Sequence, residues 1–237
     1  MIRITRMIAA AMLGTLSGIA LPVMAAEHPV VVELYTSQGC SSCPPADAYF
    51  NRELANRDDV IALALHVDYW DYIGWKDDFA DPAYTKRQRN YAKAAGKRSI
   101  YTPQMVIGGL DHVVGNVPRD VKAHLNAHAG LDAGIDLDIS RKGDRLTIAL
   151  QAQEALDVPM TVQVVRYTKE EIRNIKRGEN AGRTLTYTNI VTSWDTIGEW
   201  NTRRAKTMKT KVKGDSAVVV LVQRKGFGRI VAAALLR

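Results

Sequence analysis

Two stretches of the chain differ in how apolar and polar residues are ordered. Before residue 130, short apolar runs alternate with segments whose apolar residues recur every three or four positions, as strands alternating with helices do. After Gly130 the order changes to strict alternation, with Ile135, Leu137 and Ile139 as an example, which indicates half-buried strands. We therefore expect an α/β half followed by an all-β half.

The first half predicts a parallel crossover. Apolar runs at residues 29–35 and 60–67 predict two buried strands, and residues 44–56 between them predict a helix that begins with two prolines. Strand, helix and strand in this order favour a right-handed parallel unit. The elements expected next are a helix at residues 80–95, a hairpin at 105–114 and a helix at 118–129.

The second half predicts about seven strands without helices, a pattern typical of a β-sandwich. We place the domain boundary between residues 131 and 132, which gives an α/β domain at residues 27–131 and a β-sandwich-like domain at residues 132–237. The strands are expected at residues 135–139, 146–150, 160–167, 185–194, 203–212, 217–223 and 229–236.

The N-terminus has the pattern of a secretory signal peptide at residues 1–26. Arg3 and Arg6 precede twenty uncharged residues that end in small side chains, so cleavage is expected near Ala25 or Ala26. Two glycines and a proline shorten the apolar core below the roughly 18 to 20 residues that a membrane span needs. We expect a periplasmic or secreted protein that keeps no membrane anchor after cleavage.

Composition narrows the class of protein only slightly. With 46% hydrophobic and 24% charged residues, the chain fits neither a disordered protein nor a polytopic membrane protein. The net charge of +7 falls to +5 when the two arginines of the signal peptide are removed. A basic run at residues 86–98 is most simply a solvated helix face, and we expect no nucleic-acid partner.

Candidate chemistry rests on the chain's only two cysteines, Cys40 and Cys43, which lie between a predicted strand and a predicted helix. A thiol at the start of a helix favours its thiolate, so Cys40 is the expected nucleophile and Cys43 the resolving thiol. A purely structural disulfide is one alternative, although so short a loop gives little stability. A zinc site completed by His124 and His128 is another, with eighty residues between its halves.

Several segments resemble a known family. The chain has the order CxxC, then Tyr101-Thr102-Pro103, which is similar to thioredoxin over about residues 29–130, with Gly39 where thioredoxin has a tryptophan. The segments ELYTSQGCSSCPPAD, HVDYWDYIGWKD, YTPQMVIGG and GENAGRTLTYTNIV look like a secreted bacterial thioredoxin-like family, domain of unknown function 1223. The resemblance implies a thioredoxin-like domain followed by a β-rich domain, with a redox CxxC.

The resemblance also implies roles for single residues. Cys40 and Cys43 match the redox pair of thioredoxin. Pro103 matches its cis-proline, which leaves Thr102 free to pair with a substrate backbone. Glu33 resembles the buried acid of the first strand but lies one position further from the nucleophile, so a solvated carboxylate at the strand end is the alternative.

Aromatic residues gather after the second predicted strand. Tyr69, Trp70 and Trp75, with Tyr101 near the TP motif, are candidates for a groove that binds a polypeptide substrate, and packing in a domain interface is the alternative. His66 is either a proton relay, a metal ligand or a hydrogen-bonded structural residue. Residues 179–183 predict a long loop, with docking against the first domain as one possibility.

Taken together, the residues and the resemblance predict an exported thiol–disulfide oxidoreductase that uses no metal or organic cofactor. Its expected partners are protein thiols or disulfides of the cell envelope. One alternative is a copper(I) metallochaperone that uses the CxxC with His66 or a methionine. Another is a non-catalytic envelope protein whose β-rich half recognises its partners.

Overall fold

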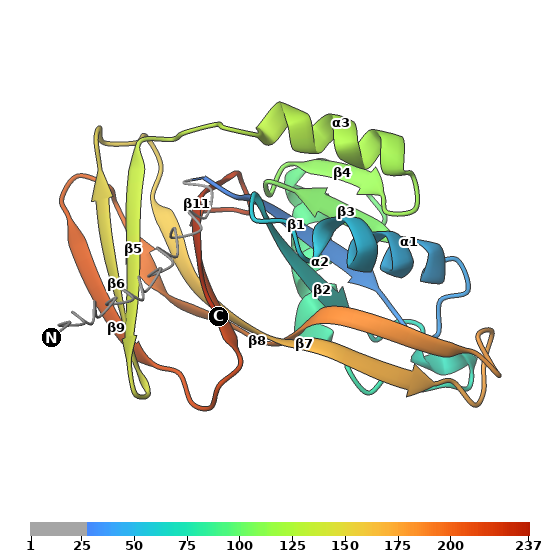
Figure 1. Cartoon of the computed structure of the whole chain (residues 1–237). Helices are drawn as coiled ribbons and strands as arrows, with labels where there is room; N and C mark the ends of the chain where they lie inside the picture. The colour runs from blue at the N-terminus through green and yellow to red at the C-terminus, as the bar shows by residue number, and fades with distance from the viewer. Residues whose placement is uncertain (1–27) are drawn as a thin grey trace, which may run out of the picture.

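The computed structural model describes residues 28–237, and the expected signal peptide lies outside these residues. Within them, eleven β-strands dominate over three α-helices, one turn of π-helix and one of 3-10 helix (Figure 1). In this part of the chain the helices are all too short or too polar to cross a membrane.

The helices lie in the first half of the chain, before residue 130. Each of the three α-helices begins with a proline, a residue that suits the first turn of a helix. Their bounds are α1 Pro44–Tyr49, which continues as the π-helical turn η1 Phe50–Leu54, then the 3-10 turn η2 Asp71–Ile73, α2 Pro82–Ala94 and α3 Pro118–His128.

The strands occupy both halves of the chain. Their bounds are β1 Val30–Thr36, β2 Val60–His66, β3 Gln104–Ile107, β4 Asp111–Val114, β5 Ile135–Lys142, β6 Arg145–Ala152, β7 Met160–Asn174, β8 Thr184–Trp200, β9 Lys206–Lys211, β10 Ala217–Arg224 and β11 Ile230–Leu236. The expected parallel crossover is confirmed, since β1 pairs parallel with β2 from Val30 opposite Val60 to Thr36 opposite His66.

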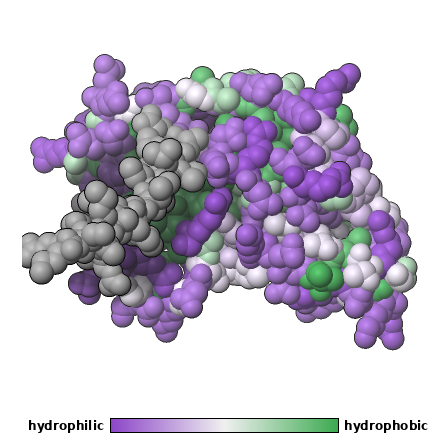
Figure 2. Space-filling view, in the orientation of Figure 1, coloured by the Kyte–Doolittle hydropathy of each residue, from purple (hydrophilic) through white to green (hydrophobic). Residues whose placement is uncertain are grey.

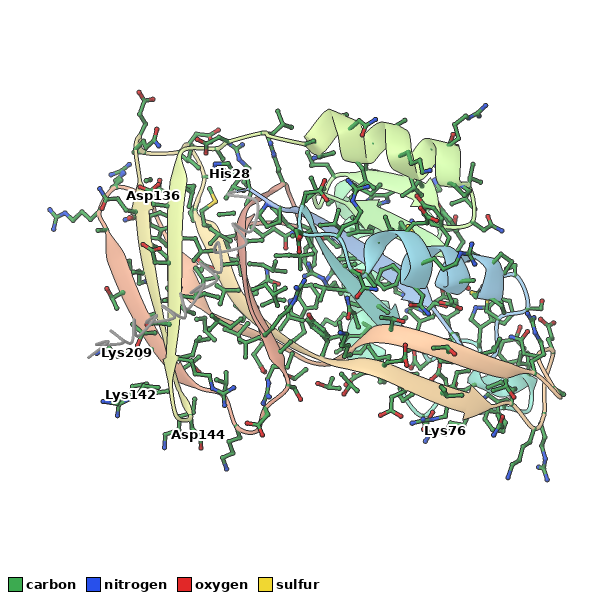
Figure 3. All side chains as sticks on the ribbon, viewed as in Figure 1. His28, Lys76, Asp136, Lys142, Asp144 and Lys209 are labelled. Atoms are coloured by element: carbon green, nitrogen blue, oxygen red, sulfur yellow. A yellow bond between two sulfur atoms is a disulfide. The ribbon has the colours of Figure 1, made fainter. Side chains whose placement is uncertain are left out.

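One mixed sheet of eight strands joins the two halves, in the order β11-β10-β7-β8-β2-β1-β3-β4. The junction is a parallel contact between β2 and β8 at Ala64 and Ile190. Strands β5, β6 and β9 form a separate three-stranded sheet, with Lys142 and Asp144 at the β5–β6 turn (Figures 1 and 3).

The expected fold class, a thioredoxin-like α/β domain followed by a β-sandwich, is therefore wrong. The chain is mostly β, with few helices, and its largest sheet runs continuously through strands from both halves. The cause is the length of β7 and β8, which have 15 and 17 residues and outrun the strands expected at 160–167 and 185–194. Their extra backbone groups pair with each other and add β8 to the edge of β2. The boundary between residues 131 and 132 stays a prediction.

Side chains of β1 alternate between two cores. Val32 and Leu34 pack with α1 and α3 on one face of the sheet, whereas Val31 and Tyr35 pack with α2 on the other. A third core lies between the small sheet and strands β7, β10 and β11. Hydrophilic side chains cover most of the face in Figure 2, as burial of the apolar strands requires. Because side chains alternate between the two faces of the sheet, only every second polar side chain of β1 or β2 lies on the face that α1 covers.

Candidate functional site

The two cysteines form a disulfide in the turn that links β1 to α1, with an S–S distance of 2.08 Å. Backbone bonds close this turn, because the Cys43 amide donates to the Cys40 carbonyl at 3.2 Å. Cys43 is the N-cap of α1, and Pro44 begins the helix as expected. Both cysteines are fully buried at 0% exposure, so a reaction partner has to displace something to reach the sulfurs.

Two hydroxyl groups lie against the Cys40 sulfur. Thr102 Oγ1 donates to Cys40 Sγ at 3.3 Å, and Ser42 Oγ lies 3.4 Å from the same sulfur. Hydroxyl donors favour the charged form of an acceptor, so they would stabilise a thiolate at Cys40 after reduction. The structure thus surrounds Cys40, rather than Cys43, with groups suited to a nucleophilic sulfur.

The loop that carries Thr102 contains a cis peptide bond between Thr102 and Pro103. Pro103 is buried directly before β3, and pairing of β3 with β1 brings this loop beside the cysteines. The Pro103 carbonyl accepts a hydrogen bond from Gly115 at 2.9 Å, which fixes the loop to the end of β4. The structure therefore brings together Cys40, Cys43, Thr102 and Pro103, as the sequence predicts.

Trp70 lies beside the cysteine turn, in the loop at residues 68–75, which we call the Trp70 loop. Its indole Nε1 donates to Thr102 Oγ1 at 2.7 Å, and Tyr72 stacks on its ring with centroids 6.5 Å apart. A Cβ at Gly39 would lie 3.2 Å from the Trp70 Cβ, so a larger residue at position 39 would crowd Trp70. Trp70 thus contacts both Thr102, which bonds to the Cys40 sulfur, and Gly39, which precedes Cys40.

We expect Trp70→Ala to speed reduction of the buried disulfide by dithiothreitol about tenfold, because thiol exchange depends on access to the sulfur. The measurement is the rate of thiol appearance in the folded oxidised protein. Tyr72→Ala is the control, since Tyr72 belongs to the same loop and is 80% exposed. Equal rates in the Trp70 variant and the parent would show that Trp70 does not limit access.

The other aromatic candidates separate into two groups. Tyr69 and Trp75 hold the Trp70 loop in place, since the Tyr69 hydroxyl donates to Gln88 at 3.2 Å and the Trp75 indole donates to Gln38 at 2.7 Å. Tyr101 precedes the cis bond and is 37% exposed. Tyr101 is thus the candidate with a ring free to meet a substrate, while Tyr69 and Trp75 serve the local structure.

Sequence reasoning left open the role of the hairpin tip, residues 175–183 between β7 and β8. Asn180 is 1% exposed, and its Nδ2 donates to the carbonyls of Gln38 at 2.9 Å and Cys40 at 3.0 Å. The Arg183 guanidinium donates to Asn180 Oδ1 at 2.9 Å and fixes the amide in this direction. Docking of this loop on the first half is therefore confirmed, and Asn180 is a site residue that the sequence analysis missed.

Glu33 lies on the face of β1 that packs against α2, and α1 with Cys43 lies on the other face. The carboxylate is fully buried and binds Arg87 at 2.7 and 2.8 Å. It also accepts hydrogen bonds from the hydroxyls of Tyr35 and Tyr91 at 2.8 and 2.6 Å. Glu33 is thus neither a solvated strand end nor a neighbour of Cys43, but the centre of a buried ion pair.

Asp47, on α1, is the buried acid that lies on the same side of β1 as Cys43. Asp47 follows Cys43 by one helical turn and is 8% exposed. Thr36 Oγ1 donates to its Oδ1 at 2.8 Å, while Oδ2 has no hydrogen-bond partner among residues 28–237. Burial raises the pKa of Asp47 to about 7, although nearby His66 opposes the shift. Asp47 therefore changes its protonation near neutral pH.

His66, at the end of β2, is fully buried near Asp47. Its Nδ1 lies 2.7 Å from Asp77 Oδ2, and its Nε2 has no partner in residues 28–237. Burial lowers the pKa of His66, but the Asp77 carboxylate outweighs this effect and the net pKa is raised. Asp77 Oδ2 also accepts from the Gln38 amide at 2.8 Å, so this pair is tied to the cysteine turn.

We expect Asp47→Asn to increase the free energy of unfolding at alkaline pH. The folded-state pKa of Asp47 lies above its ordinary value of 3.8, so the parent protein loses stability as the pH rises from about 4 to about 7. An amide does not titrate, so the variant gains about 2 to 4 kcal/mol above pH 7 and almost nothing below pH 4. Urea unfolding of the oxidised protein at both pH values measures this, and parallel pH curves for variant and parent would contradict it.

Possible metal ligands do not gather at the cysteines. His124 Nδ1 and His128 Nε2 contact Asp111 Oδ2 at 3.4 and 2.6 Å, while the two cysteines are bonded to each other. Within residues 28–237, we find no group of three or more histidine, cysteine or acidic side chains arranged to hold a metal ion. The zinc arrangement considered from the sequence is thus not assembled in this structure.

Comparison with known proteins places this site in a family. The family model described as protein of unknown function (DUF1223) matches residues 31–223. The chain belongs to the DUF1223 family. Among curated proteins none matches. The matched range includes both the cysteine segment and the segment around Asn180, so both belong to the sequence that defines the family.

Two solved structures resemble this DUF1223 protein. Protein AGR_C_4864 from Agrobacterium tumefaciens is 33% identical, with 87% of this chain and 93% of that chain covered and a TM-score of 0.74. HBP35 of Porphyromonas gingivalis is 14% identical, with 89% of this chain and 75% of that chain covered and a TM-score of 0.61. The second likeness concerns the fold alone.

Proposed function

We propose that this protein is an exported thiol–disulfide oxidoreductase that exchanges electrons with protein thiols or disulfides through Cys40 and Cys43. The observation that carries the proposal is the disulfide in the β1–α1 turn, with the Thr102 hydroxyl 3.3 Å from the Cys40 sulfur beside a cis-proline. Cys40, Cys43 and Pro103 resemble the redox pair and cis-proline of thioredoxin, and this local resemblance supports the same chemistry.

The reaction needs no resident metal or organic cofactor. In the direction of substrate reduction, the Cys40 thiolate attacks a substrate disulfide, forms a mixed disulfide and releases the first substrate sulfur as a thiolate. Cys43 then attacks Cys40 Sγ, which restores the Cys40–Cys43 bond and releases the second substrate sulfur. Two electrons pass to the substrate, and the same steps in reverse oxidise a substrate dithiol.

A stabilising role explains this disulfide poorly. Only two residues separate Cys40 from Cys43, and closing so short a loop removes little entropy from the unfolded chain. The cysteine turn also makes more hydrogen bonds with its surroundings than a purely structural disulfide requires. Thr102 and Asn180 bond to the turn from two distant segments of the chain, and Trp70 in turn donates a hydrogen bond to Thr102. Such support is expected where a reactive sulfur must be held in a fixed position.

We assign substrate choice to the β7–β8 hairpin and the exposed aromatic rings near the cysteine turn. The hairpin tip bonds to the cysteine turn through Asn180, while the exposed Tyr101 directly precedes Thr102 and the exposed Tyr72 stacks on Trp70. A polypeptide that approaches Cys40 would therefore meet aromatic rings, which suit the backbone and side chains of an extended segment. We assign envelope proteins with thiols or disulfides as the partners.

Trapping tests the proposal. In the exported full-length protein, Cys43→Ala leaves Cys40 without its resolving thiol, so mixed disulfides with partner proteins should accumulate and disappear on reduction. The double variant Cys40→Ala, Cys43→Ala is the matched control, because it lacks both sulfurs and differs from the trapping variant only at Cys40. Absence of Cys40-dependent adducts under both oxidising and reducing growth conditions would overturn the proposed function.

A further inference from the structure

We propose that Asp47 accepts the proton of the Cys43 thiol when the mixed disulfide on Cys40 is resolved, and exchanges that proton with solvent through a hollow beside α1. The inference rests on the proposed function and names the group that activates its second cysteine. Glu33, the acid suggested by resemblance, lies on the opposite face of β1 and is bound to Arg87.

The helix places Asp47 next to Cys43. The Asp47 amide donates to the Cys43 carbonyl at 3.1 Å, so the two residues stand four positions apart in a regular turn. Side chains at this spacing lie on the same helix face, with Cβ atoms about 5 to 6 Å apart. Both residues are buried. A buried thiol thus has a carboxyl group as its neighbour along the helix.

The carboxyl group has one oxygen fixed and one oxygen available. Thr36 holds Oδ1 at 2.8 Å and sets the orientation of the group. Oδ2 has less than 1 Å² of exposed surface and finds no hydrogen-bond partner in residues 28–237. A buried acceptor without a donor is costly, and a group that binds a proton during turnover removes that cost.

Titratable groups of β2, β8 and the loop before α2 face Asp47. The His66–Asp77 pair faces it from β2 and the following loop, and Tyr187 faces it from β8. Nε2 of His66 and the hydroxyl of Tyr187 also have no partner among residues 28–237, and the two rings stand 4.9 Å apart. Burial raises the pKa of Asp47 to about 7, near that of a base that works at neutral pH.

Asp47 also lines a hollow in the protein surface. It measures about 280 Å³ and lies between α1, η1 and the start of β8, with Asp47, Asn51, Arg52 and Arg183 among its lining residues. The two guanidinium groups are solvent-exposed and carry positive charge. No residue of the Trp70 loop lines this hollow, so we infer that a proton on Asp47 exchanges with water there, away from the side on which Trp70 lies.

The step balances in atoms and electrons. The proton of Cys43 moves to Asp47 Oδ2, and the Cys43 thiolate attacks Cys40 Sγ. The bond between Cys40 and the substrate sulfur breaks, the Cys40–Cys43 bond forms, and the substrate leaves as a thiolate. Asp47 then releases its proton to water in the hollow. In the reverse direction, Asp47 returns a proton to Cys43 as the internal disulfide opens.

Ellman's reagent tests this step without a physiological substrate. The reduced full chain should release one thionitrobenzoate when Cys40 reacts and a second when Cys43 resolves the mixed disulfide. We expect Asp47→Asn to slow the second release about tenfold to a hundredfold near neutral pH. The difference should shrink at a pH above the thiol's own ionisation, about 9 or higher, while the first release changes less than twofold.

Glu53→Gln is the matched control, because Glu53 is an exposed acid on the continuation of the same helix. The thiolate absorbance of Cys40→Ser gives a second readout, since a neighbouring carboxylate couples the titration of Cys43 to that of Asp47. In the double variant Cys40→Ser, Asp47→Asn, we expect the Cys43 thiol to titrate in a single step instead of two coupled steps. A second release and a thiolate titration unchanged by Asp47→Asn would overturn the inference. Loss of partner trapping with an intact effect of Asp47 would instead count against the proposed function alone.

Discussion

Cys40→Ser is expected to abolish thiol–disulfide exchange, whereas Cys43→Ser still reacts once and then stops. The reason is the asymmetry of the site. Cys40 Sγ contacts the hydroxyls of Ser42 and Thr102, and Ser42 is exposed to solvent. Cys43 is the N-cap of α1, and its carbonyl accepts a hydrogen bond from the amide of the buried Asp47 at 3.1 Å. Cys40 is thus the sulfur that a partner meets first.

Mass spectrometry after incubation with glutathione disulfide measures this asymmetry. The reduced parent should end as the internal disulfide, Cys43→Ser should carry one glutathione, and Cys40→Ser should remain unmodified for at least a hundredfold longer, since access governs attack. The two serine variants control for each other because each keeps one thiol in the same turn. Equal modification of both variants would contradict the assignment of Cys40 as the nucleophile.

Glu33→Ala is expected to lower the free energy of unfolding by about 3 to 5 kcal/mol, the cost of leaving a buried charge without its partner. The Arg87 guanidinium is nearly buried and binds Glu33 through Nε and Nη2, and it lies over the Trp194 ring at 3.7 Å. Gln163 and Gln223, from β7 and β10, also contact Arg87. The pair therefore ties α2 to both halves of the large sheet.

Urea unfolding of variants measures the contribution of this pair. Asp120→Ala is the control, since it breaks an ion pair with Arg119, whose side chain is 91% exposed, and is expected to cost less than about 1 kcal/mol. A double variant, Glu33→Leu with Arg87→Met, should recover part of the loss by removing both charges. A cost for Glu33→Ala no larger than for Asp120→Ala would contradict a structural role of the pair.

The sequence predicts the part of the site that local signals specify. Apolar runs mark β1 and β2, the two prolines mark the start of α1, and the cysteines lie between them. The TP motif precedes a strand that pairs with β1, which brings Pro103 to the cysteines. These features depend on residues close together in the chain or on a simple crossover, so pattern reasoning is sufficient for them.

Contacts between distant segments were beyond the same reasoning. Residues 168–174 are mostly polar and favour a loop, but their backbone groups pair with the start of β8 and extend both strands. The hairpin tip then reaches the cysteine turn, where Asn180 bonds to residues about 140 positions away. Only the family segment GENAG gave a signal for Asn180, and it carried no indication of the contact.

The two acids show how orientation decides a role. Alternation along β1 places Thr36 on the α1 face with Val32 and Leu34, and it places Glu33 on the α2 face. The alternation of side chains along β1 could therefore have argued, from the sequence alone, against Glu33 as a partner of Cys43. Asp47 has the position of an ordinary acid in a first helical turn, and the sequence patterns did not place the residues of β8 that lie near it.

The reduction potential of the Cys40–Cys43 pair tests the central claim most directly. It is obtained by equilibrating the full chain in a series of dithiol buffers of known reduction potential and counting the protein thiols at each potential. For a disulfide that exchanges with partners, we predict a value between about −270 and −120 mV, the span of known exchange proteins. A value below about −300 mV, typical of structural disulfides, would contradict the account.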